Sequence, residues 1–471
     1  KSEHISKIIV HPDNSNTIWV AAQGPLWSKG GERGVYKSTD GGNNWKQVLG
    51  NNEWTGATDL LIDPRNPQVL YAATWDRHRT VAAYMGGGPG TAIYKSTDGG
   101  ENWAKIHNGL PRSNMGKIGL AISPQNPDVV YAAIELDRTK GGVFRSANAG
   151  GSWTKMSNTV SGGTGPHYYQ ELYASPHKFD RLYLMNVRVL TSEDGGKNFT
   201  QLKERQKHSD NHAIAFKKDD PNYLMIGTDA GIYESFDLAE NWKYHKNLPL
   251  TQFYKVAVNN AKPFYHIFGG TQDNGSAGGP SATDEREGIS NKHWYKTLGA
   301  DGHQSATDPE YNNIIYAETQ QGGLHRVDLV TGEQVYVQPQ AQKGDPHERF
   351  NWDAPILVSP PPRRPPGQRS QATPRPSGTR TGPRRRRPGR RCPRTGPGRP
   401  EVWCFFVRVS CPSSCIRFGP RPLERFGSGV VSNATGILHD DLVTPEKSLR
   451  NLTSQSMQHL YEIDCIIPSM I

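Results

Sequence analysis

The first 391 residues contain no cysteine, because all five cysteines lie at or after Cys392. A body without cysteine cannot depend on disulfides, so cysteine usage does not indicate a redox compartment. No apolar run reaches the roughly 18 residues that a membrane-spanning helix needs, and we expect no membrane span. No charged and then apolar leader is visible at the start, so either a signal peptide has been removed or the N-terminus is that of a fragment.

An excess of positive charge is also missing from most of the chain, although the formal net charge is +10. Residues 361–471 hold 19 Lys and Arg against 7 Asp and Glu. Residues 1–360 therefore hold the other 36 Lys and Arg and the other 38 Asp and Glu. The longer part is therefore nearly neutral. Its charge balance argues against a nucleic-acid partner, and only the basic end of the chain would suit one.

What the chain does contain is a repeat. The segment "IIVHPDNSNTIWVAA" begins at Ile8 and returns as "LLIDPRNPQVLYAAT" from Leu60 and "LAISPQNPDVVYAAI" from Leu120. Each copy has an apolar stretch, a polar Pro/Asn turn and a stretch rich in Val, Tyr and Ala, which predicts two antiparallel strands. A further copy begins at Leu172, and weaker copies begin at Ile214, Val256 and Ser305.

The second half of each unit carries the pattern S-x-D-x-G-x-x-W, the Asp-box, as in "YKSTDGGNNW". Ser and Asp side chains can accept backbone N–H bonds within such a turn, Gly supplies positive φ, and the closing aromatic can pack between neighbouring sheets. We therefore interpret these residues as scaffold: Ser38, Asp40, Gly41, Trp45, Ser96, Asp98, Gly99, Trp103, Ser146, Trp153, Ser192, Asp194, Phe199, Ser235, Asp237 and Trp242.

A repeat of roughly 43 to 58 residues is the size of a four-stranded propeller blade. The sequence therefore predicts an all-β fold, a β-propeller of about seven four-stranded blades over residues 1–359, with an incomplete ring as an open alternative. An eighth unit begins at "APILVSP" and then stops matching. Residues 360–471 are expected to form a non-globular Arg/Pro-rich tail, since that composition cannot bury a core.

Two interpretations of the tail stay open. The switch in composition falls in the middle of a repeat, which favours a frameshifted or misjoined reading frame. The alternative is a genuine basic tail that binds nucleic acid or an acidic surface.

The repeats resemble those of bacterial exported Asp-box proteins, whose propellers are related to the ligand-binding domain of sortilin-type receptors. They are more distantly similar to the propeller glycosidases that cleave xyloglucan. The segments "ERGVYKSTDGG", "GGGPGTAIYKSTDGGENW" and "TQDNGS" carry the closer resemblance. It implies a fragment of a longer repeat protein and a periplasmic or secreted location, but no transferable catalytic pair.

Propellers usually bind ligands at one channel mouth, where the loop before each first strand and the loop after each second strand converge. These positions carry aromatic, acidic, Arg and His side chains, a mixture that suits a peptide, protein or glycan ligand. The candidates for ligand binding are Trp75, Arg77, Arg79, Tyr168, Tyr169, Glu171, His208, His212, Gln272, Asn274 and His303. Glu318 and Gln320 occupy the same kind of loop, and Asp210, Asp229, Asp273 and Asp301 are the candidate catalytic acids.

The segment "HSDNH" (208–212) would place three side chains on one face of a strand, where they could approach a metal. We prefer a polar lining and predict no metal and no cofactor.

Two functions remain. The first is an extracytoplasmic propeller that binds a peptide, protein or glycan. The alternative is a glycoside hydrolase with two of the four aspartates across a groove. Neither predicts an oligomeric state.

Overall fold

The structure is a computed structural model of the 471-residue chain. It describes residues 2–50, 52–137, 139–162, 167–248, 250–344, 346–359 and 402–404. These residues form two compact units that divide between Lys246 and Asn247. We call the described residues up to Lys246 unit 1 and those from Asn247 onward unit 2, and each is described by itself.

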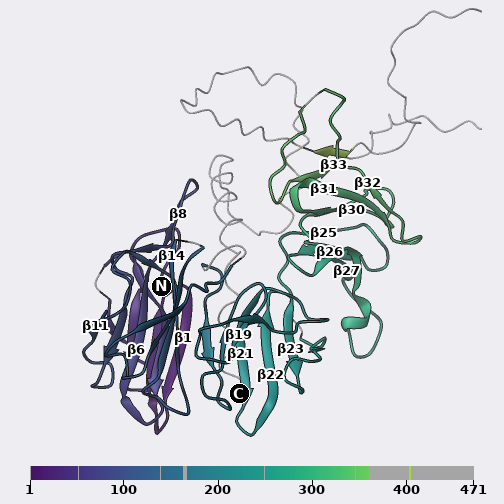
Figure 1. The fold of residues 1–471 in the computed structure, drawn as a ribbon. Helices are drawn as coiled ribbons and strands as arrows, with labels where there is room; N and C mark the ends of the chain where they lie inside the picture. Colours follow the sequence, from purple (N-terminus) through teal and green to yellow (C-terminus); the bar gives the residue numbers. More distant parts are fainter. Residues whose placement is uncertain are drawn as a thin grey trace, which may run out of the picture. The chain divides into compact units, whose positions relative to one another are not determined.

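Unit 1 contains five four-stranded antiparallel sheets (Figure 1). The first sheet comprises β1 (Ile5–His11), β2 (Asn14–Ala22), β3 (Gly34–Ser38) and β4 (Lys46–Leu49). The second comprises β5 (Thr55–Asp63), β6 (Asn66–Asp76), β10 (Ile93–Ser96) and β11 (Ala104–Ile106). The third comprises β13 (Ile118–Ile122), β14 (Val130–Asp137), β15 (Lys140–Ser146) and β16 (Thr154–Ser157).

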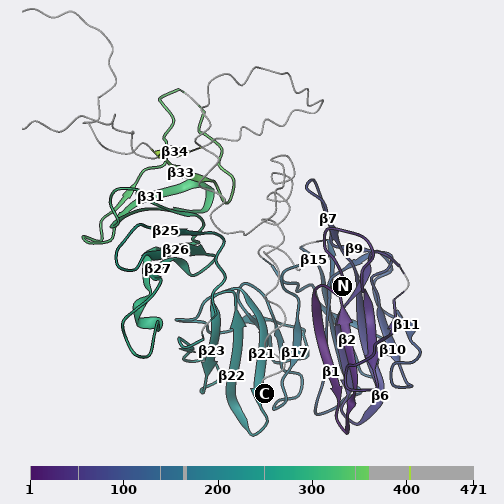
Figure 2. The same cartoon turned by 180° about the vertical axis from the view of Figure 1, so that it is seen from behind.

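The fourth sheet comprises β17 (Leu172–Ala174), β18 (Leu182–Leu184), β19 (Leu190–Ser192) and β20 (Thr200–Gln201). The fifth comprises β21 (Asn211–Lys217), β22 (Asp220–Thr228), β23 (Gly231–Ser235) and β24 (Lys243–Tyr244). Strands of one sheet lie side by side in both views, as β1 and β2 do in Figure 2. The second sheet carries an insertion between β6 and β10 that contains the pair β7 (His78–Arg79) and β8 (Tyr84–Met85) and the strand β9 (Gly87–Gly88). β9 pairs with β12 (Met115–Gly116), which lies just before the third sheet.

Unit 2 contains two more four-stranded sheets. The sixth sheet comprises β25 (Val256–Val258), β26 (His266–Thr271), β27 (Gly275–Pro280) and β28 (Tyr295–Leu298), and the turn η1 (Asn291–His293) precedes its last strand. The seventh comprises β29 (Ser305–Thr307), β30 (Ile314–Thr319), β31 (Gly323–Asp328) and β32 (Gln334–Tyr336), with η2 (Gln320–Gly322) between its second and third strands. A further pair joins β33 (Ile356–Val358) to β34 (Val402–Cys404).

Consecutive sheets within each unit pack face to face through apolar side chains. Leu60 in the second sheet packs with Trp19 of the first, and Leu120 in the third packs with Tyr71 of the second. In unit 2, Phe268 of the sixth sheet packs with Ile315 and Val327 of the seventh. This repeated burial supplies the hydrophobic stabilisation that a single four-stranded sheet lacks.

The predicted fold class is confirmed: the chain is an all-β propeller built from four-stranded antiparallel blades. The start of an eighth unit also agrees, since β33 (Ile356–Val358) forms there and Ile356 packs on the seventh sheet. The predicted tail, 360–471, lies outside the described residues except for 402–404, and its boundary stays a prediction. In the described part of the chain, no helix has the length and apolar character to cross a membrane.

Candidate functional site

The sequence-predicted residues of unit 1 gather at one edge of its sheets. Trp75 is near the end of the second strand of its sheet, and Tyr169 and Glu171 come just before β17. Asp229 directly follows β22, next to the start of β21, because Asn211 pairs with Thr228. The antiparallel pairing therefore brings the start of each first strand beside the end of each second strand, as the repeats predicted.

Five rings at this edge form a continuous series, which we call the aromatic row: Tyr84, His167, Tyr168, Tyr169 and His212. Successive ring centroids are 4.9, 4.3, 6.3 and 5.5 Å apart. The row joins the insertion of the second sheet to the first strand of the fifth sheet. Tyr84 and His167 are about 80 positions apart in sequence, so the fold and not local sequence creates the series.

Trp75 differs from the exposed stacking platform that its loop position suggested. It is 2% exposed, and its Nε1 donates to the carbonyl oxygen of Gly86 at 3.0 Å. Its ring instead carries two cations, since the Arg77 guanidinium lies 5.2 Å and the Lys117 ammonium 5.7 Å from the ring centroid. Trp75 therefore stabilises two cationic side chains of the site through cation–π contacts.

Basic and acidic side chains accompany the aromatic row. Lys117 Nζ lies 2.5 Å from Glu171 Oε1, and the Lys117 side chain is only 5% exposed. Arg79 lies over the rings of both Trp27 and Tyr84, at 5.7 and 5.8 Å. Contact with two rings restricts the orientation of this guanidinium. Lys117 was missed by the sequence analysis, although it directly precedes β13 and so meets the same positional rule.

The two candidate aspartates of unit 1 are held by neighbours. Asp210 Oδ1 accepts a hydrogen bond from Tyr169 Oη at 2.5 Å, and its Oδ2 accepts one from Ser209 Oγ at 2.5 Å. Asp229 Oδ1 lies 2.5 Å from His212 Nε2. Each carboxylate therefore already orients a ring of the aromatic row.

The expectation that "HSDNH" forms one strand face is wrong. β21 begins at Asn211, and Asp210 has a φ of 62°, which places it in a turn before the strand. His208 Nδ1 lies 4.0 Å from Asp210 Oδ2, whereas His212 turns to Asp229. Aspartate tolerates the left-handed region better than most residues, so the turn can form there.

The candidates of unit 2 gather at the corresponding edge of the sixth and seventh sheets. Asp301 Oδ1 accepts the backbone N–H of Asp273 at 2.9 Å. Gln272 Oε1 accepts the hydroxyl of Tyr254 at 2.6 Å, and the Tyr254 ring stacks on His303 with centroids 4.8 Å apart. Asn274 follows in the same turn, where its backbone N–H donates to Gln272. Gln320 lies in η2.

Two titratable groups in unit 2 are shielded from solvent. His303 is fully buried, and burial lowers its pKa. Glu318 is 1% exposed, and burial raises its pKa to about 7. The hydrogen bond from the Ala354 backbone N–H opposes this shift, because it favours the ionised carboxylate. Near neutral pH this carboxyl can therefore hold or release a proton.

Three further residues of unit 2 lie at this edge that were not among the sequence-predicted candidates: Tyr254, Trp352 and Asp353. Trp352 lies edge-on to His303 at 6.1 Å, and Asp353 Oδ2 lies 2.9 Å from Lys255 Nζ. Trp352 and Asp353 come shortly before β33, and Tyr254 comes shortly before β25. They precede the first strand of a repeat, as His303 precedes β29, so the same positional rule could have identified them.

The Asp-box residues lie elsewhere, in the turns between third and fourth strands. In the second sheet, Ser96 Oγ donates to Asp98 Oδ1 at 2.8 Å, and Asp98 also accepts the backbone and side-chain N–H groups of Asn102 at 2.9 and 2.7 Å. These hydrogen bonds lower the pKa of Asp98 to about 2, and the backbone N–H of Asn102 makes the largest contribution. The same bonding recurs at Asp40, Asp194 and Asp237.

The closing aromatics of these turns do not all pack alike. Trp153 and Trp242 are 5% and 8% exposed and belong to the apolar clusters with the preceding sheets, while Trp103 and Phe199 are half-buried against theirs. Trp45 is 43% exposed, so the expectation of packing between two sheets is wrong for this residue. The first sheet has no preceding sheet among the described residues of unit 1.

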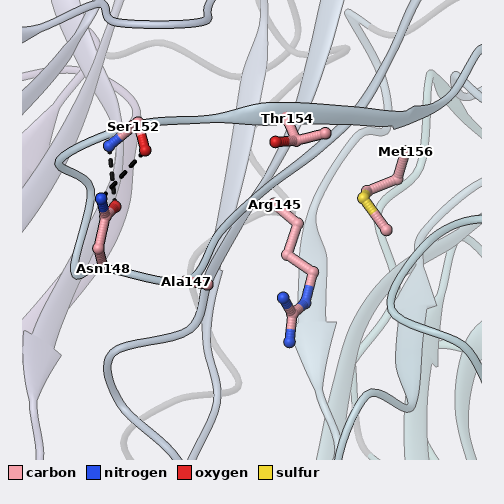
Figure 3. Close-up of a pocket in the computed structure, with 6 residues that line it drawn as sticks. All are labelled: Arg145, Ala147, Asn148, Ser152, Thr154 and Met156. Carbon is pink, nitrogen blue, oxygen red and sulfur yellow. Dashed lines mark hydrogen bonds between the residues drawn. The ribbon is translucent and has the colours of Figure 1, made fainter.

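A hollow of about 300 Å³ lies at the third Asp-box, where Asn148 stands in place of Asp. Figure 3 shows Asn148 bonded to Ser152 across the turn, with Arg145, Thr154 and Met156 farther along the two strands. Arg145 faces Asp180 at 3.3 Å. The hollow is open, and its polar groups serve the turn or the neighbouring sheet, so it is a weaker candidate than the strand-edge residues.

No group of three or more His, Cys, Asp or Glu side chains suited to a metal occurs within the described ranges.

Comparison with known proteins finds distant similarity to glycosidases. A xyloglucanase of Paenibacillus sp is 25% identical over 156 residues, and the xyloglucanase Xgh74A of Acetivibrio thermocellus is 23% identical over 217 residues. The matches cover 28% and 40% of this chain but only 14% and 25% of those relatives. No family model matches the chain.

Among solved structures, an ancestral GH74 enzyme matches 71% of this chain and 46% of its own chain, with 16% identity and a TM-score of 0.39. The chain therefore covers less than half of that enzyme, and it is distantly similar in sequence to xyloglucanases over part of its length.

Proposed function

We propose that this chain binds an extended glycan along the aromatic row of unit 1. The observation that carries the proposal is the continuous contact among Tyr84, His167, Tyr168, Tyr169 and His212. Tyr169 is 3% exposed and supports the row from within, contrary to its predicted role in ligand contact, while the other four rings are partly exposed. Sugar rings present apolar faces that stack on aromatic side chains, and a series of rings suits a polymer better than a compact ligand.

Charged groups beside the row suit sugar hydroxyls. Arg79 is fixed between two rings, and Glu171 is held by Lys117 at 2.5 Å. Forked and charged side chains with fixed orientation can direct several hydroxyls at once. Similarity to xyloglucanases supports a glycan over a peptide as the ligand, and xyloglucan is the first polymer to test.

The contacts of Asp210 and Asp229 favour binding over hydrolysis in unit 1. A retaining or inverting glycosidase needs two carboxyl groups that face the scissile bond from opposite sides. Both oxygens of Asp210 accept hydrogen bonds from Tyr169 and Ser209, and Asp229 is paired with His212. We therefore assign both aspartates to positioning the aromatic row.

We place this function outside the cytoplasm, as the resemblance to exported Asp-box proteins implies, and the relation to sortilin-type receptors remains part of the proposal. The partner is then a glycan or, as the competing ligand class, a peptide or protein.

An array of glycans and peptides tests the ligand class. The proposal predicts retention of the full-length chain on xyloglucan or another β-linked glycan, with weaker retention of Asp210→Ala, which releases Tyr169. Asp284→Ala, an exposed aspartate of unit 2 outside the candidate residues, serves as the matched control and should retain binding. Binding to peptides alone would refute the glycan proposal.

The hydrolase alternative is tested by release of reducing ends from the same glycans. The proposal predicts no release by the wild-type chain. Release that is abolished in Asp210→Asn or Asp273→Asn would establish the hydrolase instead.

A further inference from the structure

A short segment of unit 2, Phe350–Ala354, covers the shielded side chains described above, and we call it the strap. Its residues are described in full and lie between β32 and β33. The strap is not part of any strand, so its position depends on the contacts that it makes with the seventh sheet and with the residues before the sixth sheet.

Hydrogen bonds, an ion pair and ring contacts hold the strap, including the edge-on contact of Trp352 with His303. The Ala354 amide donates to Glu318 Oε1 at 2.7 Å, and the Trp352 carbonyl accepts the Gln321 amide at 3.1 Å. Asp353 pairs with Lys255 at 2.9 Å. The Phe350 ring fills the space beside Gly322, where a Cβ would lie 2.3 Å from it. No residue of 350–354 belongs to the apolar clusters of unit 2, so the strap can open without disrupting them.

Several buried polar atoms lie under or beside the strap. Both ring nitrogens of His303, Oε2 of Glu318 and Oδ1 of Asp353 have no hydrogen-bond partner among the described residues. His303 is fully buried and Glu318 is 1% exposed. Native proteins rarely leave such groups unsatisfied, because each costs free energy comparable to a lost hydrogen bond. Their concentration in one place indicates a site built to receive polar groups.

We propose that the strap covers a second binding site in unit 2, lined by Tyr254, His303 and Glu318, that takes a single neutral sugar residue. The site deepens the proposed function and rests on it for the ligand class. This second site can be tested separately from the aromatic row of unit 1.

The charges of the site favour an uncharged ligand. Lys255 and Asp353 already neutralise each other at 2.9 Å, so a charged ligand would lack a counter-ion in a shielded place. Burial keeps His303 in its neutral form, with one ring nitrogen able to donate and the other to accept. Hydroxyl groups both donate and accept, so they match this set. The rings of Tyr254 and Trp352, which both contact His303, supply an aromatic lining that suits the apolar face of a sugar.

The proton on Glu318 couples strap closure to pH. Burial under the closed strap raises the Glu318 pKa from 4.5 to about 7; Asp353 adds to that shift, while the Ala354 amide and Lys255 oppose it. Closure therefore favours the protonated carboxyl. Its stabilising contribution is complete below the ordinary pKa of 4.5 and is lost as the pH rises toward 7.

Hydrogen exchange of the strap amides in the full-length chain tests the proposal. A saturating xyloglucan oligosaccharide should change exchange at 350–354 in the wild type and in Tyr168→Ala, which weakens the aromatic row only. His303→Phe, which keeps a ring that can contact Tyr254 and Trp352 but removes both nitrogens, should abolish that change. Should His303→Phe fail to fold, Glu318→Gln provides the second variant.

Glu318→Gln keeps an oxygen that can accept the Ala354 amide but cannot ionise. Without sugar, protection of the strap in the wild type should fall by up to roughly 70-fold between pH 5 and 8 beyond intrinsic exchange, and stay constant in Glu318→Gln. Failure of Tyr168→Ala to weaken glycan binding would refute the row while leaving the strap effect in place. Unchanged exchange at 350–354 with saturating oligosaccharide in the wild type would overturn the second site.

Discussion

Single aspartates divide into those that bond within an Asp-box turn and those that bond to the aromatic row, and their hydrogen-bond partners distinguish them. Asp98 and Asp210 are both aspartates in irregular segments. The first bonds only within its own turn, to Ser96 and Asn102, whereas the second bonds to Tyr169 of the aromatic row. Side-chain partners thus separate two roles that residue type alone does not.

The buried serine of an Asp-box is predicted to contribute to stability. Ser146 is fully buried, and its Oγ accepts the amide of Gly150 at 2.9 Å and bonds to Asn148. Ser146→Ala should lower the free energy of unfolding by about 1–2 kcal/mol, since it leaves a buried amide unpaired. Urea denaturation measures this change. Ser113→Ala, at an exposed loop position, is the control and should leave the midpoint unchanged.

The Asp-box carboxylates predict a loss of stability in acid. Hydrogen bonds hold the pKa of Asp40, Asp98 and Asp194 at about 2, below the usual 3.8. A lowered pKa stabilises the folded state above pH 3.8, and that contribution is lost as the pH falls toward 2. The urea midpoint should therefore decrease between pH 4 and 2. Asp98→Asn should show a smaller decrease; an equal decrease would contradict the assignment.

At the scale of elements, the packing between sheets decides which equivalent residues matter. Ile8 and Leu60 occupy the same place in the repeat, yet Ile8 is 49% exposed and Leu60 is fully buried, because Leu60 packs on a preceding sheet. The sequence predicted the repeat and its strands because the apolar periodicity is local. The exposure of a side chain depends on the neighbouring sheet, so it could not be predicted from the sequence of one repeat.

The Asp-box aromatics supply a direct comparison of this effect. Trp153→Ala should lower stability by about 3–5 kcal/mol, because it leaves a cavity in the cluster with Tyr71 and Ile93. Trp45→Ala should cost about 1 kcal/mol or less, since that ring is 43% exposed. Thermal unfolding of both variants gives the comparison. Equal losses would show that Trp45 is buried in solution.

The candidate site was predictable in position but not in detail. The rule that ligands meet the start of first strands and the end of second strands located Tyr169, Asp210 and Glu171 together. It did not anticipate that Trp75 would be covered by Gly86, or that Asp210 would leave the strand. Both outcomes depend on loop conformations, which involve residues from the insertion and from neighbouring sheets.

For the whole molecule, the repeated sheets provide a nearly neutral scaffold whose polar and aromatic groups concentrate at one edge in each unit. Four-stranded sheets repeat from β1 to β32 with little variation, while the residues before the first strand differ from one repeat to the next. This division is expected of a binding protein, because packing restricts the sheets and leaves the loops free to vary. The aromatic row is the most continuous result of that variation.

The central claim is that the aromatic row binds a glycan, and calorimetric titration of a xyloglucan oligosaccharide into the full-length chain tests it most directly. Tyr168→Ala should weaken binding about tenfold, or ~1.4 kcal/mol, because it removes one stacking ring from the middle of the series. Trp45→Ala, the matched loss of an exposed aromatic away from the row, should leave the affinity unchanged. Equal affinities for wild type and Tyr168→Ala would contradict the account.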